Sequence, residues 1–464
     1  FHVITAVGTQ DATLDGLIIQ EGNADPPPLD PNNPASTPDP TLAPQGGGLY
    51  LYDARVAVTD CRFRHNTAAF AGGAIAAISS RLVIRHSVFR ENHGASQVAH
   101  FATGGGMALF AHLSDVQLLD SRVTDHMNSS SVAGGALKIQ YSTATIERTV
   151  IANNSVVAGA AGLFAYDTDL TVRDALFEGN QAYFHAGGLR VEFGSATVEN
   201  TRFVSNRCSG YMINDCDEST TDPSFPSAGG GGASFILVKA TLRNCVFWRN
   251  HVNGSGGALY FGFGAEYTLV NSTLSYNNAV HTGGGIYHEG VNDSFTWNSI
   301  LMSNTATSAA NLYTEAPNSM EVDYCNITGY PGTHSISQMP VWATLPSGGT
   351  LSAVTHDPET GLTTLEDAGA SWTPDALTGS FVSAPGGNCH QRTWTILANT
   401  ATTLTVDHYD LLCGLDAGAS YQFETAALDP SSPGIDLGND AVAPPTDIDG
   451  RPRTDGDGNG SVLP

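Results

Sequence analysis

The sequence has few charged residues, and very few of those are basic. Charged residues make up 14% of the 464 residues, and 19 basic residues face 45 acidic ones, for a formal net charge of -26. A surface of this sign repels a phosphate backbone and an anionic membrane, which excludes nucleic acid as a partner. Divalent cations are the partners that it favours.

Long apolar runs are missing as well. No stretch approaches the roughly 20 apolar residues that cross a bilayer, so no transmembrane segment is expected. The sequence begins at Phe1, without an initiating Met and without a signal peptide. We therefore expect a mature or trimmed chain.

Paired cysteine motifs are absent: the seven cysteines form no C-x-x-C and no zinc spacing. Cys208 and Cys216 flank a short loop, and Cys389 and Cys413 bracket part of one segment. We predict a disulfide in each pair, and hence an oxidising compartment. The other three share one position of a repeat and are predicted to be small buried apolar residues, namely Cys61, Cys245 and Cys325.

Glycine and a repeated unit are what the sequence has in abundance. There are 51 glycines, many of them in pairs, which favours strands and tight turns over helices. Residues 241–287 contain one unit twice: an alternating strand ending in F-x-x-N or L-x-x-N, a turn, Gly-Gly, and a second alternating strand. The unit recurs along most of the chain, usually every 26 to 28 residues, which is typical of a solenoid.

Two rows of residues keep the same position in successive units. One row is apolar and contains Phe63, Phe89, Val123, Ile151, Phe177, Phe203, Phe247, Leu274, Leu301 and Ile327. The other is almost all asparagine and contains Asn66, Asn92, Asn154, Asn180, Asn206, Asn250, Asn277 and Asn304, with His126 as a substitute. We predict a stacked core row and a buried amide row that satisfies turn backbone groups.

This period, with alternating apolar positions and no helical periodicity, predicts an all-β fold: a parallel β-helix of about eleven coils, roughly 50 Å long. The tetrapeptides F-R-H-N (63 to 66), F-R-E-N, F-E-G-N and F-W-R-N alternate with G-G-A-I at 72 and G-G-A-L at 134 and 256. With these motifs, residues 12–328 resemble the right-handed parallel β-helices of the pectin-lyase-like fold. They are most similar to the repeats of polymorphic outer-membrane proteins and autotransporter adhesins. The resemblance implies an extracellular protein or one of the bacterial cell surface.

The insertions all leave from one corner of the unit, between the asparagine and the Gly pair. They comprise residues 24–45, 93–103 and 207–228. Insertions in a solenoid gather on its binding face, so this edge is a candidate for recognition; surface loops also tolerate insertion anywhere.

The repeat ends near Asn326. We predict a β-helix over 1–345, a small all-β module inserted near the C-terminus over 346–424, and a terminal segment with an acidic Asp/Gly-rich tail over 425–464. The tail resembles the C-terminal segment of secreted β-helix proteins that continue into an anchoring signal.

The tail also contains the start of a calcium loop. Asp455, Asp457 and Asn459 follow the D-x-D-x-N-G pattern in which alternate oxygens converge on the ion. The acid expected at the twelfth position would fall beyond Pro464. Calcium is therefore a candidate cofactor, and a solvated acidic tail is the alternative.

No residue is predicted to be catalytic. A polysaccharide lyase or hydrolase would need clustered carboxylates with an Arg or Lys on one outer sheet, or paired acids. The sequence contains no clustered N-T-D, D-D, G-H-G and R-x-K set. Asp125 and His126 are adjacent where the asparagine row is broken, and His126 is better explained as a member of that row.

One outward row is a candidate binding site. Leu259, Ile286 and Leu312 should point inward, so Tyr260, Tyr287 and Tyr313 should point outward and stack on consecutive coils. Aromatic rings on a flat sheet pack against sugars or a partner protein, although tyrosine is also simply common in strands.

The first coil carries no polar cap, so we expect either that a cap was lost with upstream residues or that a second copy stacks there head to tail, as in a filament. The sequence thus favours a non-catalytic extracellular protein of structural or adhesive type, whose partners are itself, a surface glycan or a protein. A polysaccharide lyase or glycoside hydrolase is the alternative.

Overall fold

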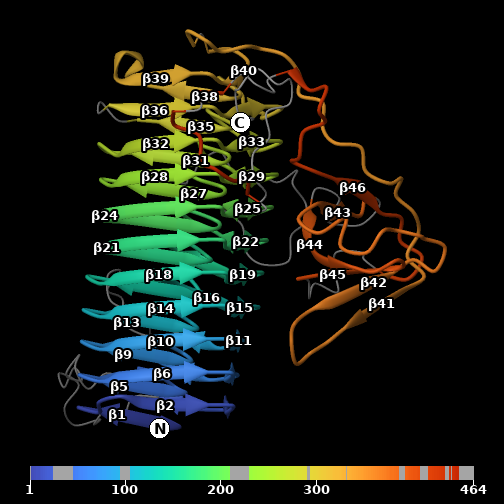
Figure 1. Ribbon diagram of the computed structural model, residues 1–464. Helices are drawn as coiled ribbons and strands as arrows, with labels where there is room; N and C mark the ends of the chain where they lie inside the picture. The colour runs from blue at the N-terminus through green and yellow to red at the C-terminus, as the bar shows by residue number, and fades with distance from the viewer. Residues whose placement is uncertain are drawn as a thin grey trace.

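The chain forms a parallel β-helix with a small antiparallel module beside it (Figure 1). The computed structural model describes residues 2–24, 45–94, 105–208, 229–289, 293–330, 332–385, 392–407, 416–433, 438–439 and 441–448. One face of the helix is an eleven-stranded parallel sheet with one strand from each coil, so the predicted fold class is confirmed. None of the described residues forms a helix with the length and apolar character that a bilayer span requires.

Each coil contributes strands to four faces, which we number in chain order. The first face contains β1 (Ile4–Val7), β5 (Leu49–Tyr52), β9 (Ile75–Ile78), β13 (Leu109–His112), β17 (Leu137–Gln140), β27 (Ala233–Ile236), β31 (Leu259–Gly262), β35 (Ile286–His288) and β38 (Leu312–Thr314). The second contains β2 (Ala12–Asp15), β6 (Arg55–Thr59), β10 (Arg81–Arg85), β14 (Asp115–Leu119), β18 (Thr143–Glu147), β28 (Lys239–Arg243), β32 (Glu266–Val270), β36 (Ser294–Trp297) and β39 (Met320–Asp323). Two long strands run through both faces, namely β21 (Leu163–Arg173) and β24 (Leu189–Glu199).

The third face is the eleven-stranded sheet. Its strands are β3 (Ile18–Gln20), β7 (Arg62–Arg64), β11 (Val88–Arg90), β15 (Arg122–Thr124), β19 (Val150–Ala152), β22 (Leu176–Glu178), β25 (Arg202–Val204), β29 (Val246–Trp248), β33 (Thr273–Ser275), β37 (Ile300–Met302) and β40 (Asn326–Ile327). The short fourth face contains β4 (Asn23–Ala24), β8 (Thr67–Ala68), β12 (His93–Gly94), β16 (Met127–Ala133), β20 (Ser155–Ala158), β23 (Gln181–Ala182), β26 (Arg207–Cys208), β30 (His251–Val252) and β34 (Asn278–Ala279). The three insertions follow β4, β12 and β26, so all of them leave from this face.

The apolar row forms the predicted stack inside the third face. Phe177 lies 4.9 Å from Phe203 between ring centroids, and Phe203 lies 4.6 Å from Phe247 with parallel planes. The buried thiols Cys61, Cys245 and Cys325 belong to the same core, as the sequence predicts. The Gly corner is equally cramped: Gly283 has φ 65°, and a Cβ there would overlap the carbonyl oxygen of Ile286.

The asparagine row is the predicted buried amide ladder. The Asn180 side chain donates from Nδ2 to Asn206 Oδ1 at 2.9 Å, and Asn206 donates to Asn250 Oδ1 at 3.0 Å. Each amide also donates to a strand carbonyl, as Asn206 does to Phe177 O at 2.8 Å. His126 takes the place of an asparagine, with Nδ1 2.9 Å from Asn154 Oδ1. Complete burial lowers the pKa of His126 to about 3, so this ring is neutral and structural.

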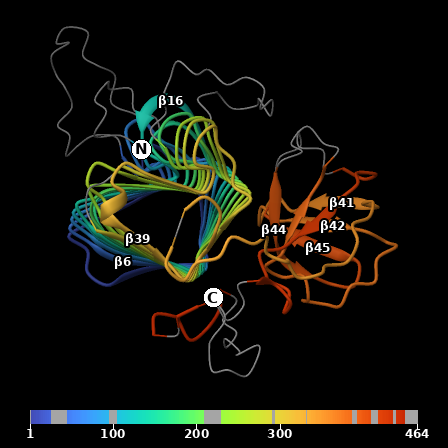
Figure 2. The ribbon, with the colours of Figure 1, turned by 90° about the horizontal axis from the view of Figure 1, so that it is seen from above.

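The module lies against the third face (Figure 2). Its antiparallel strands are β41 (Ala353–His356), β42 (Thr363–Glu366), β43 (Phe381–Ser383), β44 (Thr393–Asn399), β45 (Thr403–Val406) and β46 (Gln422–Glu424). Before it the chain passes through the 3-10 helix η1 (Pro317–Ser319). The two stretches that flank the module pair with each other through an antiparallel bridge between Trp342 and Leu428.

Charged and aromatic contacts hold the module in place. At one end, Trp248 stacks on Phe381 at 5.2 Å, and Arg249 binds both carboxylate oxygens of Glu424 at 2.7 and 2.8 Å. At the other end, Arg62 and Arg64 each contact Glu359. A long line of contacts along a rigid rod fixes the module in one position.

Buried acids lie in the middle of this interface. Arg122 pairs with Asp407 at 2.6 Å, and Arg90 pairs with Asp125 at 3.0 Å. Burial, followed by the nearby Asp407, raises the pKa of Asp125 to about 7, in spite of Arg90. Glu178 accepts from the Thr395 amide at 2.7 Å, and complete burial raises its pKa to about 8. The acids and arginines of the third face that form these pairs are therefore covered by the module.

Candidate functional site

The predicted tyrosine row exists on the first face. Tyr260 pairs in register with Tyr287, and Tyr287 with Tyr313, so the three occupy consecutive coils. Their ring centroids are 5.1 and 5.4 Å apart, with interplanar angles of 9° and 12°. Tyr260 is 9% exposed, and the other two are half-buried. The predicted geometry is confirmed.

This stack presents ring edges and hydroxyls rather than ring faces, because each face lies against the next ring. Tyr260 donates to Glu289 at 2.9 Å, and Tyr287 donates to Glu315 at 2.7 Å. Burial, followed by these carboxylates, raises the pKa of both hydroxyls, which therefore remain donors. The row is suited to hydrogen bonding with a hydroxyl-rich ligand, and less to stacking on one.

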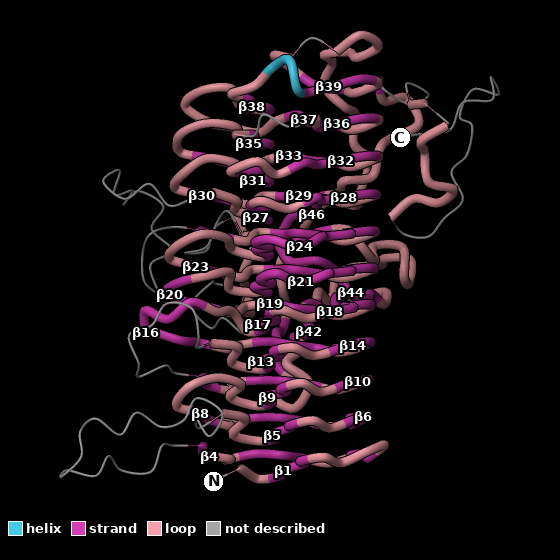
Figure 3. Tube along the Cα trace, turned by 90° about the vertical axis from the view of Figure 1, so that its left-hand side faces the viewer, coloured by secondary structure: helices cyan, strands magenta, loops and turns pink. Residues whose placement is uncertain are grey.

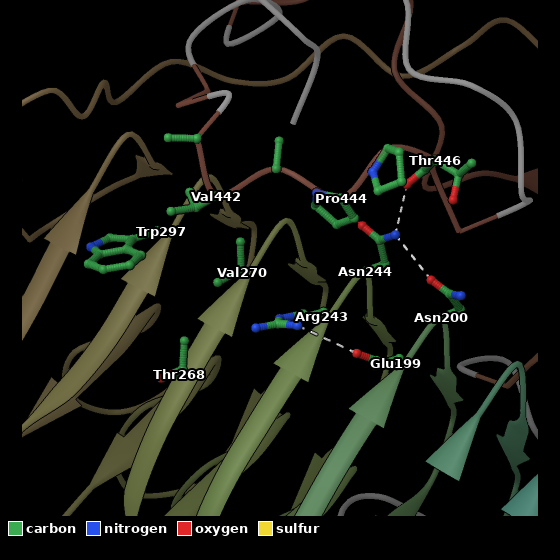
Figure 4. Close-up of a pocket in the computed structure, with 13 residues that line it drawn as sticks. Glu199, Asn200, Arg243, Asn244, Thr268, Val270, Trp297, Val442, Pro444 and Thr446 are labelled. Carbon is green, nitrogen blue, oxygen red and sulfur yellow. Dashed lines mark hydrogen bonds and ion pairs between the residues drawn. The ribbon is translucent and has the colours of Figure 1, made fainter. Parts of the chain in front are cut away.

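A pocket of about 520 Å³ opens beside the same coils, on the second face (Figure 4). The wall on the helix contains Trp297, Thr268 and Val270, together with Arg243 and Glu199. Residues 441–446 form the opposite wall. The Arg243 guanidinium lies 3.7 Å from the Glu199 carboxylate, which also accepts a hydrogen bond from Arg173 at 2.9 Å. The guanidinium has five N–H donors and therefore retains hydrogen-bonding capacity.

A corner row of asparagines holds the segment that forms this opposite wall. Asn298 makes two hydrogen bonds to the Asn439 backbone, at 3.0 and 2.8 Å, and Asn244 donates to Thr446 O at 2.8 Å. Asn271 lies between these two anchors in the row, and its buried Nδ2 has no hydrogen-bond partner among the described residues. The segment is thus held at both ends, and the pocket lies between the anchors.

The pocket combines an aromatic ring with charged and polar groups. The half-buried Trp297 supplies an aromatic surface, and its Nε1 donates to Glu321 at 3.0 Å, which fixes the ring. Planar charged groups and amides on the neighbouring strands can bind hydroxyls in pairs. An apolar surface with a few convergent polar groups is typical of a small-ligand pocket.

A second polar cluster lies on the first face. Lys138 is 1% exposed, and its Nζ lies 5.7 Å from the Phe164 ring centroid. Arg190, two coils further along, pairs with Glu192. Burial lowers the pKa of Lys138 to about 8, although Glu192 opposes the shift. A lysine that titrates near neutral pH is suited to act as a base.

The predicted disulfides receive no support. No disulfide is seen among the described residues, and both predicted pairs include cysteines outside them, so each pair stays a prediction. The Cys208 side chain is fully buried in β26 and packs with Val252 and Ala279, in the inward position of the fourth face. Cys216, Cys389 and Cys413 lie outside the described residues.

The predicted calcium loop lies outside the described residues too, because Asp455, Asp457 and Asn459 all fall there. In the described part of the chain, no three His, Cys, Asp or Glu side chains come together as a metal site would require. Calcium binding by the tail stays a prediction, and so does head-to-tail stacking.

The sequence did not predict the pocket. The asparagines of the corner row, Asn200, Asn244, Asn271 and Asn298, each stand three residues before the apolar row residue of their unit. All four have φ near 50°, a conformation that asparagine tolerates well. The recurrence of asparagine at this position could therefore have predicted a corner of the coil. That residues 441–446 return to this corner could not be read from the repeat.

Comparison with known proteins gives one match. A family described as "Right handed beta helix region" matches residues 39–203 and 126–274, which together span just over half of the chain. No curated protein and no solved structure matches.

Proposed function

This chain belongs to the family of right-handed β-helix regions, and from that premise we propose that it is a non-catalytic extracellular protein that binds a surface glycan. The family covers both pectate-lyase-like enzymes and adhesive proteins, so the fold alone does not choose between them. The choice between an enzyme and an adhesive protein therefore rests on the pocket and the side-chain clusters of this chain. The proposal includes display at a bacterial cell surface, which the acidic, charge-poor composition favours.

The observation that carries the proposal is the pocket at Trp297. It combines a fixed aromatic ring with Arg243, Glu199 and Thr268. Tyr287 belongs to the same coil, and its hydroxyl is already oriented toward Glu315. One end of the rod therefore offers apolar and hydrogen-bonding groups on two neighbouring faces, as a sugar with apolar C–H faces and hydroxyl edges requires.

Replacing Trp297 by alanine is expected to weaken glycan binding at least about tenfold, which equals about 1.4 kcal/mol. The reason is the loss of the ring on which the sugar packs. Binding to a panel of immobilised oligosaccharides measures this. Tyr52→Ala is the matched control, because Tyr52 is a 40% exposed aromatic residue near the opposite end of the rod. Equal binding by Trp297→Ala and the wild type would contradict the proposal.

A lyase is the second candidate, and the Lys138 cluster is what favours it. A polysaccharide lyase removes the proton next to a uronate carboxylate and expels the glycosidic oxygen, which leaves a double bond. Lys138 would take the proton, and Arg190 would bind the carboxylate. Because Lys138 is 1% exposed, this requires movement of the residues that cover it.

The lyase candidate predicts ultraviolet absorbance from unsaturated products when the protein is incubated with uronate polysaccharides. Lys138→Met should lower that rate at least about a hundredfold, as loss of a general base does. Lys239→Met is the control, since Lys239 is an exposed lysine on the second face. Absence of unsaturated products from the wild type, or full activity of Lys138→Met, would eliminate the lyase.

A further inference from the structure

A row of large apolar side chains lies on the outer edge of the rod, at the bend between the first and second faces. This edge faces the viewer in Figure 3, and it lies opposite the module in Figures 1 and 2. In consecutive coils the bend is occupied by Leu113, Tyr141, Asp167, Phe193, Leu237 and Phe263. The five apolar residues of this row, which we call the edge ridge, are 39% to 62% exposed.

The edge ridge is costly for folding. Its residues have φ between 47° and 59°, a left-handed conformation that bulky side chains rarely adopt. Earlier coils use residues that suit this bend, namely Gly8, Asp53 and Ser79. Apolar side chains that are both strained and exposed do not stabilise the monomer, and strain of this kind gathers where a protein binds something.

The aromatic members are regularly spaced. Tyr141, Phe193 and Phe263 follow one another at every second coil. With neighbouring strands roughly 4.8 Å apart, the rings recur at about 10 Å along a straight line. That distance is close to the length of two linked pyranose rings. In an extended β-1,4-linked chain, every second ring also presents the same face.

The rings are also held in place. Tyr166 packs edge to face against Tyr141 at 5.5 Å and against Phe193 at 5.3 Å. Polar side chains run alongside on the second face, where Ser195 donates to Asp169 at 2.7 Å and Thr143 to Asp115 at 3.4 Å. The edge therefore offers aromatic rings beside a line of hydrogen-bonding groups, which matches the apolar faces and hydroxyl edges of a sugar chain.

Charge argues against two other occupants. A net charge of -26 makes a second copy of this chain and an anionic lipid surface both repulsive. A neutral polysaccharide incurs no such repulsion. We propose that the edge ridge docks an extended, neutral β-1,4-linked polysaccharide, with Tyr141, Phe193 and Phe263 each packing on every second sugar. This goes beyond the Trp297 pocket and is independent of it.

Co-sedimentation with microcrystalline cellulose and with insoluble chitin tests the proposal. The wild type should pellet with at least one of them. The triple variant Tyr141→Ser, Phe193→Ser, Phe263→Ser should bind at least about tenfold more weakly. Its fold should survive, because Ser79 already occupies the same bend at φ 49°. Tyr52→Ala should pellet like the wild type, because Tyr52 is an exposed aromatic residue outside the edge ridge.

A variant with altered ring spacing distinguishes docking of a polysaccharide in register from nonspecific apolar adsorption. Asp167→Tyr combined with Phe193→Ser keeps three aromatic rings on the edge but places two of them on adjacent coils. Its binding to the polymer should be weakened nearly as much as that of the triple variant. Full binding by either variant, or no pelleting of the wild type with either polymer, would overturn the proposal. Binding to phosphatidylcholine vesicles by the wild type and not by the triple variant would also overturn it. So would a dimer of the wild type, absent from the triple variant, in sedimentation velocity.

Discussion

Replacing Asn206 by alanine is expected to lower the free energy of unfolding by about 4 kcal/mol, one of the two largest effects that the structure predicts. The Asn206 Oδ1 accepts from both the backbone and the side-chain amide of Asn180, and its Nδ2 donates to Phe177 O. Alanine removes these three buried hydrogen bonds, and the Asn180 Nδ2 keeps only its bond to Ile151 O. Chemical denaturation measures the loss, and hydrogen exchange shows whether the coils on either side of β26 open.

The matched control is Asn278→Ala. Asn278 follows a ladder asparagine directly, but its side chain is solvent-accessible and donates to Thr305 at 2.6 Å. Loss of its side-chain hydrogen bonds to Thr305 and His251 should cost about 2 kcal/mol or less. If Asn206→Ala were no more destabilising than Asn278→Ala, the amide ladder would not be what closes the turns.

The second large effect concerns pH and the docking of the module. The pKa of Glu178 is near 8 in the folded protein and near 4.5 when the side chain is free. Between these values the docked state binds more protons than the undocked one, so docking is strongest at low pH. It weakens as the pH rises from about 4.5 to about 8, by about 5 kcal/mol over the full window.

Asp125, whose pKa is near 7, contributes in the same direction. Asp407 and Arg392 also act on Glu178, the first raising and the second lowering its pKa.

Trp248 stacks on the module, so its fluorescence during thermal unfolding reports docking. Glu178→Gln keeps an oxygen acceptor for the Thr395 amide and removes the charge. It should melt at a higher temperature than the wild type at pH 8 and at the same temperature at pH 4. A wild-type interface that became more stable between pH 5 and pH 8 would contradict this assignment.

The fold was predictable because the coils repeat the same local pattern of strands, turns and side-chain contacts. Asn206 and Phe203 keep the same offset in nearly all units, and a side chain at a fixed offset must meet its counterpart in the next coil. His126 was predictable for the same reason, since its ring nitrogens replace the amide contacts. The stacked order of Tyr260, Tyr287 and Tyr313 also followed from the alternation of inward and outward residues.

What the repeat could not reveal is what packs on it from elsewhere in the chain. Trp248 has the same sequence setting as other third-face residues, yet it packs against Phe381 and Glu424 of the module. Trp297 lines a pocket only because residues 441–446 return to the asparagine corner. Contacts between distant segments have no period, so they leave no pattern in the sequence.

The proposed function has one central claim, that the helix holds a polysaccharide without cutting it. The most direct measurement incubates the wild type with a panel of soluble and insoluble polysaccharides, and follows both retention of the protein and the chain length of the polymer. We predict retention by at least one polymer whose length does not change. Shortened chains or unsaturated ends would contradict the claim, and so would a failure to bind any member of the panel.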